Sequence, residues 1–477
     1  MIAKKKWLLL AALLLSNVLF VSAKVKLPAV LSDNMVLQRQ TAVNLWGWGM
    51  PGDKIVIKTS WDNVKYRTTC KADGSWMTQV ATPEAGGPYE ISISDGDPVV
   101  LRNIMIGEVW LCSGQSNMEM KLKAAHGQPI IGAADAIARA NSRKGIRMCT
   151  VRRNPALQPL DTCGGMWQVN YPEAVANTSA VAYFFAEYLW DALQIPVGII
   201  CSSWSGSWIQ PWIDKEEFRN FPDVYERILQ ADTVKVKDPY SQPTVLYNGM
   251  IHPIRNYTLR GVIWYQGEGN VYEPSDRYKK LMPAMVSCWR RVFQQDLSFY
   301  YVQIAPFKYG NPNGTEAAGL RQAQFECLES IPNVGMVATT DIGERECIHP
   351  ANKPEVGRRL ALWALARTYG VNAVPYSGPL FKSCRLEDDW LVVEFDHAGS
   401  GLVTNGEPVT GFEILDSAGN IHRAEARIDG SRIKVRCGGI TDPRELRFGY
   451  RNYLPTNLYN GYMLPAVPFR ALIGPAR

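Results

Sequence analysis

The sequence predicts an α/β domain with a mainly parallel sheet, flanked on both sides by β-rich regions. Between residues 104 and 375, strand-like apolar runs alternate with helical segments, as is typical of α/β domains. Before and after that stretch, short runs with partial alternation are separated by Gly, Pro, Asp and Asn turns. The 477 residues also exceed what one core usually serves. We therefore expect domains at 24–103, 104–375 and 376–477.

The first 23 residues have the pattern of a secretory signal peptide. Three lysines at positions 4–6 precede a mostly apolar stretch over 7–20, and residues 21–23 match a cleavage site. The apolar stretch is too short for a comfortable membrane span, and no cysteine follows it directly. We expect an exported chain, periplasmic or secreted, without a membrane anchor.

Charge and cysteine usage exclude some classes of function. The signal peptide contains three lysines and no acid, so its removal lowers the net charge from +6 to +3, which gives no reason to expect nucleic acid or a membrane surface as a partner. The ten cysteines form no CxxC pair and no Cys/His cluster, so structural zinc is not expected. Export permits disulfides, but the pairing and the oligomeric state are not readable from the sequence.

The elements follow in order. The amino-terminal region has strand-like runs at 35–38, 43–48, 54–58 and 89–94. The central region has buried strand-like runs at 109–112, 197–201, 261–265, 299–305 and 334–338, with helices at 178–193, opened by Asn177 or Thr178, and 353–369. The carboxy-terminal region returns to strand-like runs at 390–395, 411–415, 431–436 and 445–450.

The stretch from Gly107 to Met120 is the centre of the functional prediction. The apolar run 109–112 leads into Ser113-Gly-Gln-Ser-Asn117, and helix-forming residues follow. A strand that ends in such a turn and starts a helix places Ser116 at the carboxyl edge of the sheet, where ligands of open α/β sheets bind. Backbone N–H groups at the helix start can stabilise negative charge there.

Three later strands also end in polar turns, which contain Gly206, Asn270 and His349. Acyl transfer through a serine needs a base and donors for an oxyanion. His349 is the best candidate base, and His252 is its competitor, although apolar neighbours favour a buried structural role for His252. Gly206, the amide of Asn270 and the N–H of Ser116 are the candidate donors.

These residues match a known family. The blocks Gly114-Gln-Ser-Asn117, the Gly206 segment, Trp264-Tyr-Gln-Gly-Glu-Gly-Asn270 and Ile348-His-Pro350 resemble the four ordered blocks of the SGNH hydrolases, in their sialate O-acetylesterase branch. The resemblance extends through nearly the whole mature chain. It includes the opening residues 27–38, the stretches 179–203, 247–253 and 320–324, and the closing residues 464–470.

The resemblance implies a flavodoxin-like α/β/α domain with β-rich accessory regions that removes O-acetyl groups from sugars. Ser116 would be the nucleophile and His349 the base, and Ser116, Gly206 and Asn270 would form the oxyanion hole. The mechanism would be two-step, through an acetyl-enzyme. No metal or organic cofactor is implied.

The sequence departs from the family pattern at two places. Many SGNH enzymes have an Asp three residues before the histidine; here that residue is Glu346, with Asp341 as the alternative acid and a Ser-His pair also possible. Ser205 replaces the first Gly of a Trp-Gly-Gly segment. Gln266 and Glu268 are expected to shape the pocket or bind sugar hydroxyls, although for Glu268 a role in stabilising the Asn270 loop is as reasonable.

O-acetylated sialic acid is the leading substrate. The alternatives are an esterase acting on acetylated xylan or another polysaccharide, and an inactive glycan-binding protein.

Overall fold

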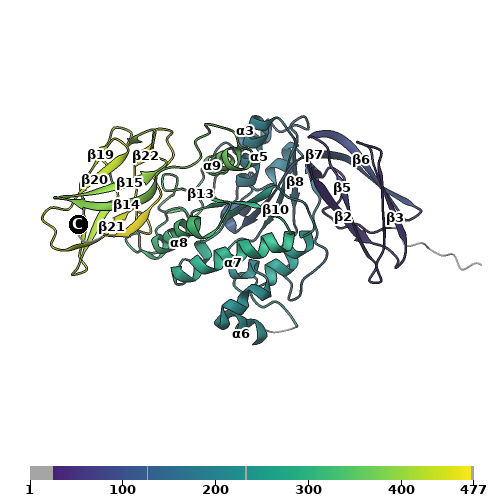
Figure 1. Cartoon of the computed structure of the whole chain (residues 1–477), viewed down its shortest axis with the longest axis horizontal. Coiled ribbons are helices and arrows are strands. Elements are labelled where there is room, and N and C mark those ends of the chain that lie inside the picture. Colours follow the sequence, from purple (N-terminus) through teal and green to yellow (C-terminus); the bar gives the residue numbers. More distant parts are fainter. Residues whose placement is uncertain (1–24, 126, 231–233, 474–477) are drawn as a thin grey trace, which may run out of the picture.

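The computed structural model of the chain describes residues 25–125, 127–230 and 234–473. The signal peptide predicted at 1–23 lies outside these residues. Figure 1 shows three parts in a row along the long axis: a β-rich part from the start of the chain, a central α/β part and a β-rich part at the carboxyl end. None of the described helices is long and apolar enough to cross a membrane.

The central part is built on a mainly parallel sheet with the order β13-β12-β11-β7-β10-β8-β9. Only the short edge strand β9 runs antiparallel to its neighbour. The strands are β7 (Pro98–Gly114), β8 (Ile146–Thr150), β9 (Trp167–Val169), β10 (Val197–Ser203), β11 (Gly261–Tyr265), β12 (Ser298–Val302) and β13 (Val334–Val337). β7 comes first in the chain and lies between β10 and β11, so the strand order reverses there and a crevice opens beside its carboxyl end.

Helices cover both faces of this sheet, which gives three layers. α5 (Ala180–Leu193) and α9 (Lys353–Trp363) pack on one face with Trp110 and Cys112 of β7. α7 (Ser275–Phe293) and α8 (Glu316–Ser330) pack on the other face with Val109 and Leu111. Because successive strand residues point to opposite faces, the unbroken apolar run of β7 serves two cores.

Shorter helical segments lie in the connections. They are α2 (Ser116–Glu119), α3 (Ala133–Ala138), α4 (Pro172–Ala176), η1 (Gln210–Trp212), η2 (Lys215–Asn220), α6 (Pro222–Gln230), η3 (Tyr247–Ile251), η4 (His252–Ile254), η5 (Glu268–Asn270) and η6 (Ala364–Thr368).

The amino-terminal part is joined to the central part through β7 itself. The first half of β7 pairs with β1 and β6, and its second half pairs with β10 and β11. The strands are β1 (Val36–Gln38), β2 (Ala42–Trp48), β3 (Lys54–Thr59), β4 (Lys65–Thr69), β5 (Ser75–Ala81) and β6 (Gly86–Ser94). The boundary expected at residue 103 therefore falls inside a continuous strand.

The carboxy-terminal part is a sandwich of two antiparallel sheets, β14-β15-β20-β19 and β18-β17-β21-β23, around a core of its own. The strands are β14 (Leu380–Glu387), β15 (Trp390–Asp396), β16 (Leu402–Val403), β17 (Phe412–Asp416), β18 (Ile421–Arg423), β19 (Ala426–Asp429), β20 (Arg432–Arg436), β21 (Pro443–Phe448), β22 (Tyr459–Asn460) and β23 (Phe469–Leu472).

The strands expected from apolar runs are present in the structure, but two helix predictions need correction. The helix expected after Ser116 is the single turn α2, and turns follow it. The cap of α5 is Ser179, whose hydroxyl accepts from the N–H of Ala182 at 3.2 Å, and not Asn177 or Thr178. All ten cysteines lie in the described residues, and all are free.

Candidate active site

Ser116 lies directly beyond the carboxyl end of β7, in the first turn of α2. Gly114 lets the chain pass close to β11 there, since it has φ +140° and a Cβ at this position would meet the carbonyl oxygen of Tyr265 at 2.1 Å. Any other residue would clash with this backbone. The turn is thereby held at the centre of the sheet, with Ser116 9 % exposed.

His349 reaches Ser116 from the loop between β13 and α9. Its Nε2 lies 2.9 Å from Oγ of Ser116, which is hydrogen-bond distance for a nucleophile and its base. The two residues are 233 positions apart in the chain, and the fold brings them together as the sequence predicts. His252, the competitor, instead has its Nδ1 2.9 Å from the carbonyl oxygen of Leu160.

Neither candidate acid contacts His349. The carboxylate of Glu346 is exposed and forms ion pairs with Lys308 and Arg345. Asp341 is held by both terminal nitrogens of Arg359, at 2.8 and 2.6 Å. Nδ1 of His349 is buried and has no hydrogen-bond partner among the described residues. Of the three alternatives, the geometry therefore fits the Ser-His pair, and neither Glu346 nor Asp341 is placed to orient His349.

The backbone donors expected for the oxyanion hole are free. Within the described part of the chain, the N–H groups of Ser116 and Gly206 donate to no other group. Gly206 has φ +77°, the left-handed conformation that favours glycine. A negatively charged oxygen beside this turn can therefore take hydrogen bonds without displacing an internal partner.

Asn270, the third expected donor, is differently placed. Its amide nitrogen donates to Oε1 of Gln210 at 3.0 Å and to Oε2 of Glu273 at 2.8 Å, which uses both amide hydrogens. Its oxygen accepts from the N–H of Ile209 at 3.0 Å and from Gln266 at 2.8 Å. Asn270 thus ties its loop to the segment after Gly206, and it would have to release one acceptor to serve an oxyanion.

Gln266 and Glu268 also differ from each other. Gln266 is fully buried and bonds the carbonyl of Ser207 at 3.1 Å, so it supports the loops and does not face solvent. Glu268 is 8 % exposed, and its Oε1 accepts from Asn117 at 2.5 Å. Its Oε2 is buried without a partner among the described residues, which leaves an acceptor for another group.

Asn117 joins three of the loops at the site, and its role was missed at the level of sequence. Its amide nitrogen donates to Glu268 and, at 3.1 Å, to the carbonyl of Ile348, the residue before His349. Its oxygen accepts from Nζ of Lys353 at the start of α9, at 2.5 Å. Lys353 is 1 % exposed. Asn117 and Lys353 are 236 positions apart, so nothing in the residue order signals that they form a buried pair.

Burial and charge shift the titration of this cluster. Burial lowers the pKa of His349, and the nearby Lys353 lowers it further. Burial lowers the pKa of Lys353 to about 7, opposed by Glu268. Burial raises the pKa of Glu268, opposed by its hydrogen bond from Asn117 and by Lys353. A lowered histidine pKa keeps the base neutral, and so ready to accept the serine proton, at more acidic pH.

Beside the turn that contains Gly206, the cation Arg153 lies against the aromatic ring of Trp204, and Trp204 contacts Tyr240. The carboxylate of Glu119 accepts from the N–H of Ser205 at 2.7 Å and pairs with Arg153. The guanidinium of Arg153 lies 4.9 Å from the ring centre of Trp204, which meets Tyr240 edge to face. The Arg153 side chain is 45 % exposed. No group of three or more His, Cys, Asp or Glu side chains in the described chain could hold a metal ion.

Comparison with known proteins connects this geometry with a family. The family model described as carbohydrate esterase, sialic acid-specific acetylesterase, matches residues 106–365. The sialate O-acetylesterase of Rattus norvegicus is 29 % identical over 415 residues, covering 74 % of this chain and 76 % of the rat protein. The human sialate O-acetylesterase is 29 % identical over 385 residues, covering 73 % and 72 %.

A solved structure agrees over a still larger part of the chain. The crystal structure of a carbohydrate acetylesterase from Xanthomonas citri superposes with a TM-score of 0.85 at 35 % identity, covering 94 % of this chain and 99 % of that one. The residues that the family model matches, 106–365, include the Ser116 turn and the His349 loop. Since the family model spans more than half of the 477 residues, the chain belongs to the sialic acid-specific acetylesterase family of carbohydrate esterases and is a carbohydrate O-acetyl esterase.

Proposed function

We propose that this esterase removes O-acetyl groups from sialic acids through an acetyl-serine intermediate. The observation that carries the mechanism is the 2.9 Å contact between Oγ of Ser116 and Nε2 of His349, beside two free backbone donors. Such an arrangement is what nucleophilic catalysis by serine needs.

In the first step Ser116 gives its proton to Nε2 of His349 while Oγ bonds to the acetyl carbon. The carbonyl oxygen becomes negatively charged and takes hydrogen bonds from the N–H groups of Ser116 and Gly206. When the carbon–oxygen bond to the sugar breaks, His349 returns the proton to the sugar oxygen. Water then repeats these steps on the acetyl-enzyme, with His349 as base, and acetate leaves.

The preference for sialic acid rests on Arg153. Sialic acids carry a carboxylate, and a partly exposed guanidinium can bind it through two hydrogen bonds. Arg153 shares Glu119 with the N–H of Ser205, the neighbour of Gly206, so its charge lies close to the proposed oxyanion donors. The rat and human relatives are named for the same substrate class.

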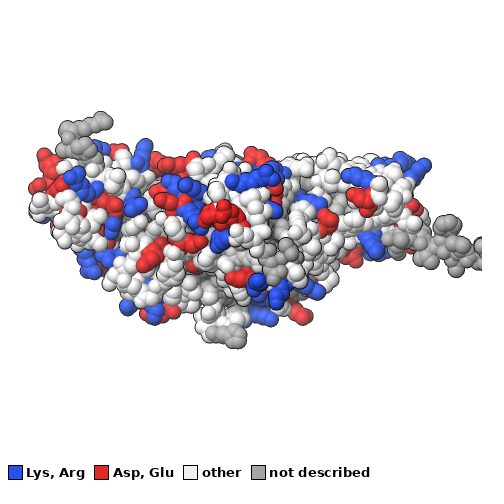
Figure 2. All heavy atoms as spheres, turned by 90° about the horizontal axis from the view of Figure 1, so that it is seen from below, with Lys and Arg blue, Asp and Glu red and all other residues white. Residues whose placement is uncertain are grey.

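We also infer that the chain is exported, because residues 1–23 have the signal pattern described above. Acidic and basic side chains are interspersed over the face shown in Figure 2. This mixture on the shown face supports the view that a small neutral or singly charged molecule, and not nucleic acid, is the partner.

The test compares p-nitrophenyl acetate, 9-O-acetylated N-acetylneuraminic acid and acetylated xylan as substrates. Ser116→Ala is expected to lower kcat by at least about 10³-fold on every substrate. Arg153→Gln is expected to lower kcat/KM about tenfold on the acetylated sialic acid and to leave p-nitrophenyl acetate nearly unchanged. Arg152→Gln, which removes the adjacent exposed charge, is the matched control.

Full activity of Ser116→Ala would disprove the assigned nucleophile. Faster acetate release from acetylated xylan than from the sialic acid, with no effect of Arg153→Gln, would replace sialic acid by a neutral polysaccharide as the substrate.

A further inference from the structure

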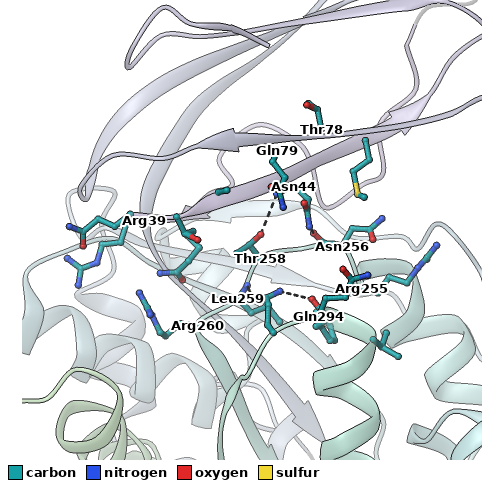
Figure 3. A pocket seen from close by; sticks show the side chains of 18 residues that line it. Arg39, Asn44, Thr78, Gln79, Arg255, Asn256, Thr258, Leu259, Arg260 and Gln294 are labelled. Atoms are coloured by element: carbon teal, nitrogen blue, oxygen red, sulfur yellow. Dashed lines mark hydrogen bonds between the residues drawn. The ribbon is translucent and has the colours of Figure 1, made fainter. Parts of the chain in front are cut away.

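A polar cavity of about 870 Å³ lies between the two-stranded sheet β2–β5 of the amino-terminal part and the central domain (Figure 3). One side is formed by the end of β1, the loop after it, and β2 and β5. The other side is formed by residues 255–260 and the end of α7. The residues that line it include three arginines and many amide and hydroxyl side chains, and no Asp or Glu. Cavities between domains are common places for ligands.

Hydrogen bonds across the gap hold the two walls together. Asn44 of β2 donates through its side chain to the carbonyl of Asn256 at 3.1 Å and through its N–H to the hydroxyl of Thr258 at 3.4 Å. Asn44 lies opposite Gln79 in the β2–β5 pair, so the two amides share one face of the sheet. These hydrogen bonds fix the distance between the two walls of the cavity.

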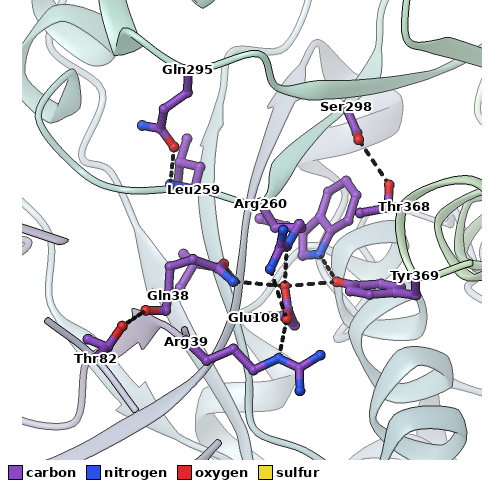
Figure 4. Close-up of polar contacts among 12 residues, drawn as sticks. Gln38, Arg39, Thr82, Glu108, Leu259, Arg260, Gln295, Ser298, Thr368 and Tyr369 are labelled. Carbon is purple, nitrogen blue, oxygen red and sulfur yellow. Dashed lines mark hydrogen bonds and ion pairs between the residues drawn. The ribbon is translucent and has the colours of Figure 1, made fainter. Parts of the chain in front are cut away.

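Arg39 and Arg260 lie at one end of this cavity and Arg255 at the other (Figure 3). Arg39 and Arg260 are both attached to Glu108, whose side chain is completely buried behind the wall. Glu108 accepts from Nε of Arg39 at 2.5 Å and from Nε of Arg260 at 2.7 Å (Figure 4). It also accepts from Gln38 at 3.0 Å and from the hydroxyl of Tyr369 at 3.3 Å.

The charge at this end of the cavity is unbalanced. Two guanidinium groups share one carboxylate, so one positive charge has no acidic partner among the described residues. The side chains of Arg39 and Arg260 are 26 % and 36 % exposed, so both reach solvent. Arg255, in contrast, has Asp161 as its partner at 2.9 Å. A ligand with one negative charge would complete the balance.

We propose that this cavity is a second, non-catalytic binding site for an acidic saccharide, with a sugar carboxylate at Arg39 and Arg260 and sugar hydroxyls on the amides and hydroxyls of the other wall. Guanidinium groups bind carboxylates through paired hydrogen bonds, and their Nε atoms are already fixed by Glu108. The bound arginines lose little freedom when the ligand arrives, which favours affinity.

The site is separate from the active site, although both lie on β7. Glu108 and Gly114 are six residues apart on one extended strand, which corresponds to about 20 Å at about 3.3 Å per residue. A saccharide in the cavity would therefore not contact Ser116. The proposal needs no assumption about catalysis, and its failure can be separated from failure of the proposed function.

The test uses methyl resonances of methionine in the full chain with Ser116→Ala, to prevent turnover. Met77 lines the cavity and is 46 % exposed, and Met120 donates its N–H to the carbonyl of Ser116, so each reports on one site. 3′-Sialyllactose is the probe and lactose its neutral control. We expect sialyllactose, and not lactose, to shift Met77 in a saturable way.

The variant Arg260→Gln removes the surplus charge and leaves Glu108 paired with Arg39, so no buried charge is orphaned. It should weaken the Met77 response at least about tenfold and leave that of Met120 unchanged. Arg102→Gln is the control, because Arg102 is an exposed arginine of β7 that lies outside the cavity. It should change neither the Met77 nor the Met120 response. Arg39→Gln is the second variant, with the same expectation as Arg260→Gln. An unmoved Met77, an equal response to lactose, or an unchanged response in both cavity variants would overturn the proposal.

Discussion

At the scale of single residues, the main feature is that His349 contacts Ser116 through Nε2 but contacts no carboxylate through Nδ1 among the described residues. Nδ1 of His349 is buried without a partner among the described residues, while Glu346 and Asp341 are engaged by Lys308 and Arg359. The loop of His349 is instead fixed through the carbonyl of Ile348, which accepts from Asn117. Backbone anchoring of this kind can orient the imidazole without a carboxylate.

Glu346→Gln is therefore expected to change kcat on p-nitrophenyl acetate by less than about tenfold, against the roughly 10⁴-fold loss known for a functional triad acid. Steady-state kinetics measures this effect. A large loss of kcat in Glu346→Gln would show that this loop closes onto His349 during turnover.

Asp341→Asn should lower the free energy of unfolding, because it weakens the ion pair of the buried Arg359. Urea unfolding measures this effect.

The charge of Lys353 should be visible in the pH profile. His349 must be neutral to accept the serine proton, and Lys353 lowers its pKa, so wild-type kcat/KM should persist below the pH at which a free histidine becomes protonated. Lys353→Met removes the cation, raises the pKa of His349 and should move the acidic limb of kcat/KM to higher pH.

Lys123→Met, which removes an exposed lysine, is the control and should leave the limb in place. An unmoved limb in Lys353→Met would show that the charge of Lys353 does not set the pKa of His349, and would leave its hydrogen bond to Asn117 as its role. Glu268, the other charged group of the cluster, is retained in both variants.

At the scale of elements, the start of α5 supports the nucleophile turn. The hydroxyl of Ser179 caps α5 and donates to the carbonyl of Met118 at 2.5 Å. A helix that packs along the sheet thus also holds the single turn that carries Ser116. This contact explains how so short a helix as α2 is kept in place.

Ser179→Ala should lower the free energy of unfolding by about 2 kcal/mol, the sum of a lost cap and a lost buried hydrogen bond. Ser330→Ala, at the exposed end of α8, should change it by less than about 0.5 kcal/mol. Urea unfolding followed by fluorescence measures both. Equal stability of the two variants would contradict the capping role.

At the scale of the whole molecule, the three parts are not equally independent. The amino-terminal sheet and the central domain share β7 and one hydrophobic core, whereas the carboxy-terminal sandwich has a separate core. We expect calorimetry to show one unfolding transition for the first two parts and another for the sandwich.

Phe469→Ala tests this division, because Phe469 is fully buried in the sandwich core and its ring stacks on that of Phe381, with the ring centres 4.3 Å apart. Loss of its ring should cost about 3–5 kcal/mol and lower only the transition of the sandwich. Ile57→Ala, in the fully buried core of the amino-terminal sheet, should instead lower the transition shared with the central domain. A single transition that moves in both variants would contradict the division.

The sequence allowed the sheet and the Ser116–His349 pair to be predicted, because each strand is marked by a local apolar run such as 261–265 and each of the two residues lies in a polar turn after a strand. Other features depend on partners distant in the chain. Lys353 meets Asn117 across 236 positions, and Glu346 turns to Lys308 and away from His349, so residue order alone does not reveal either. Likewise, the single turn α2 is held by Ser179, which lies 61 positions further along the chain from Met118.

The double role of β7 also restricts how proteins of this design can change. An insertion or deletion of one residue between Glu108 and Gly114 would turn the residues on one side of it, among Val109 to Cys112, toward the opposite core. Depending on which half of the strand keeps its pairing, it would displace either Ser116 from His349 or Glu108 from its two arginines. New specificities are therefore expected to arise in the loops that follow the strands, while the length of β7 stays constant.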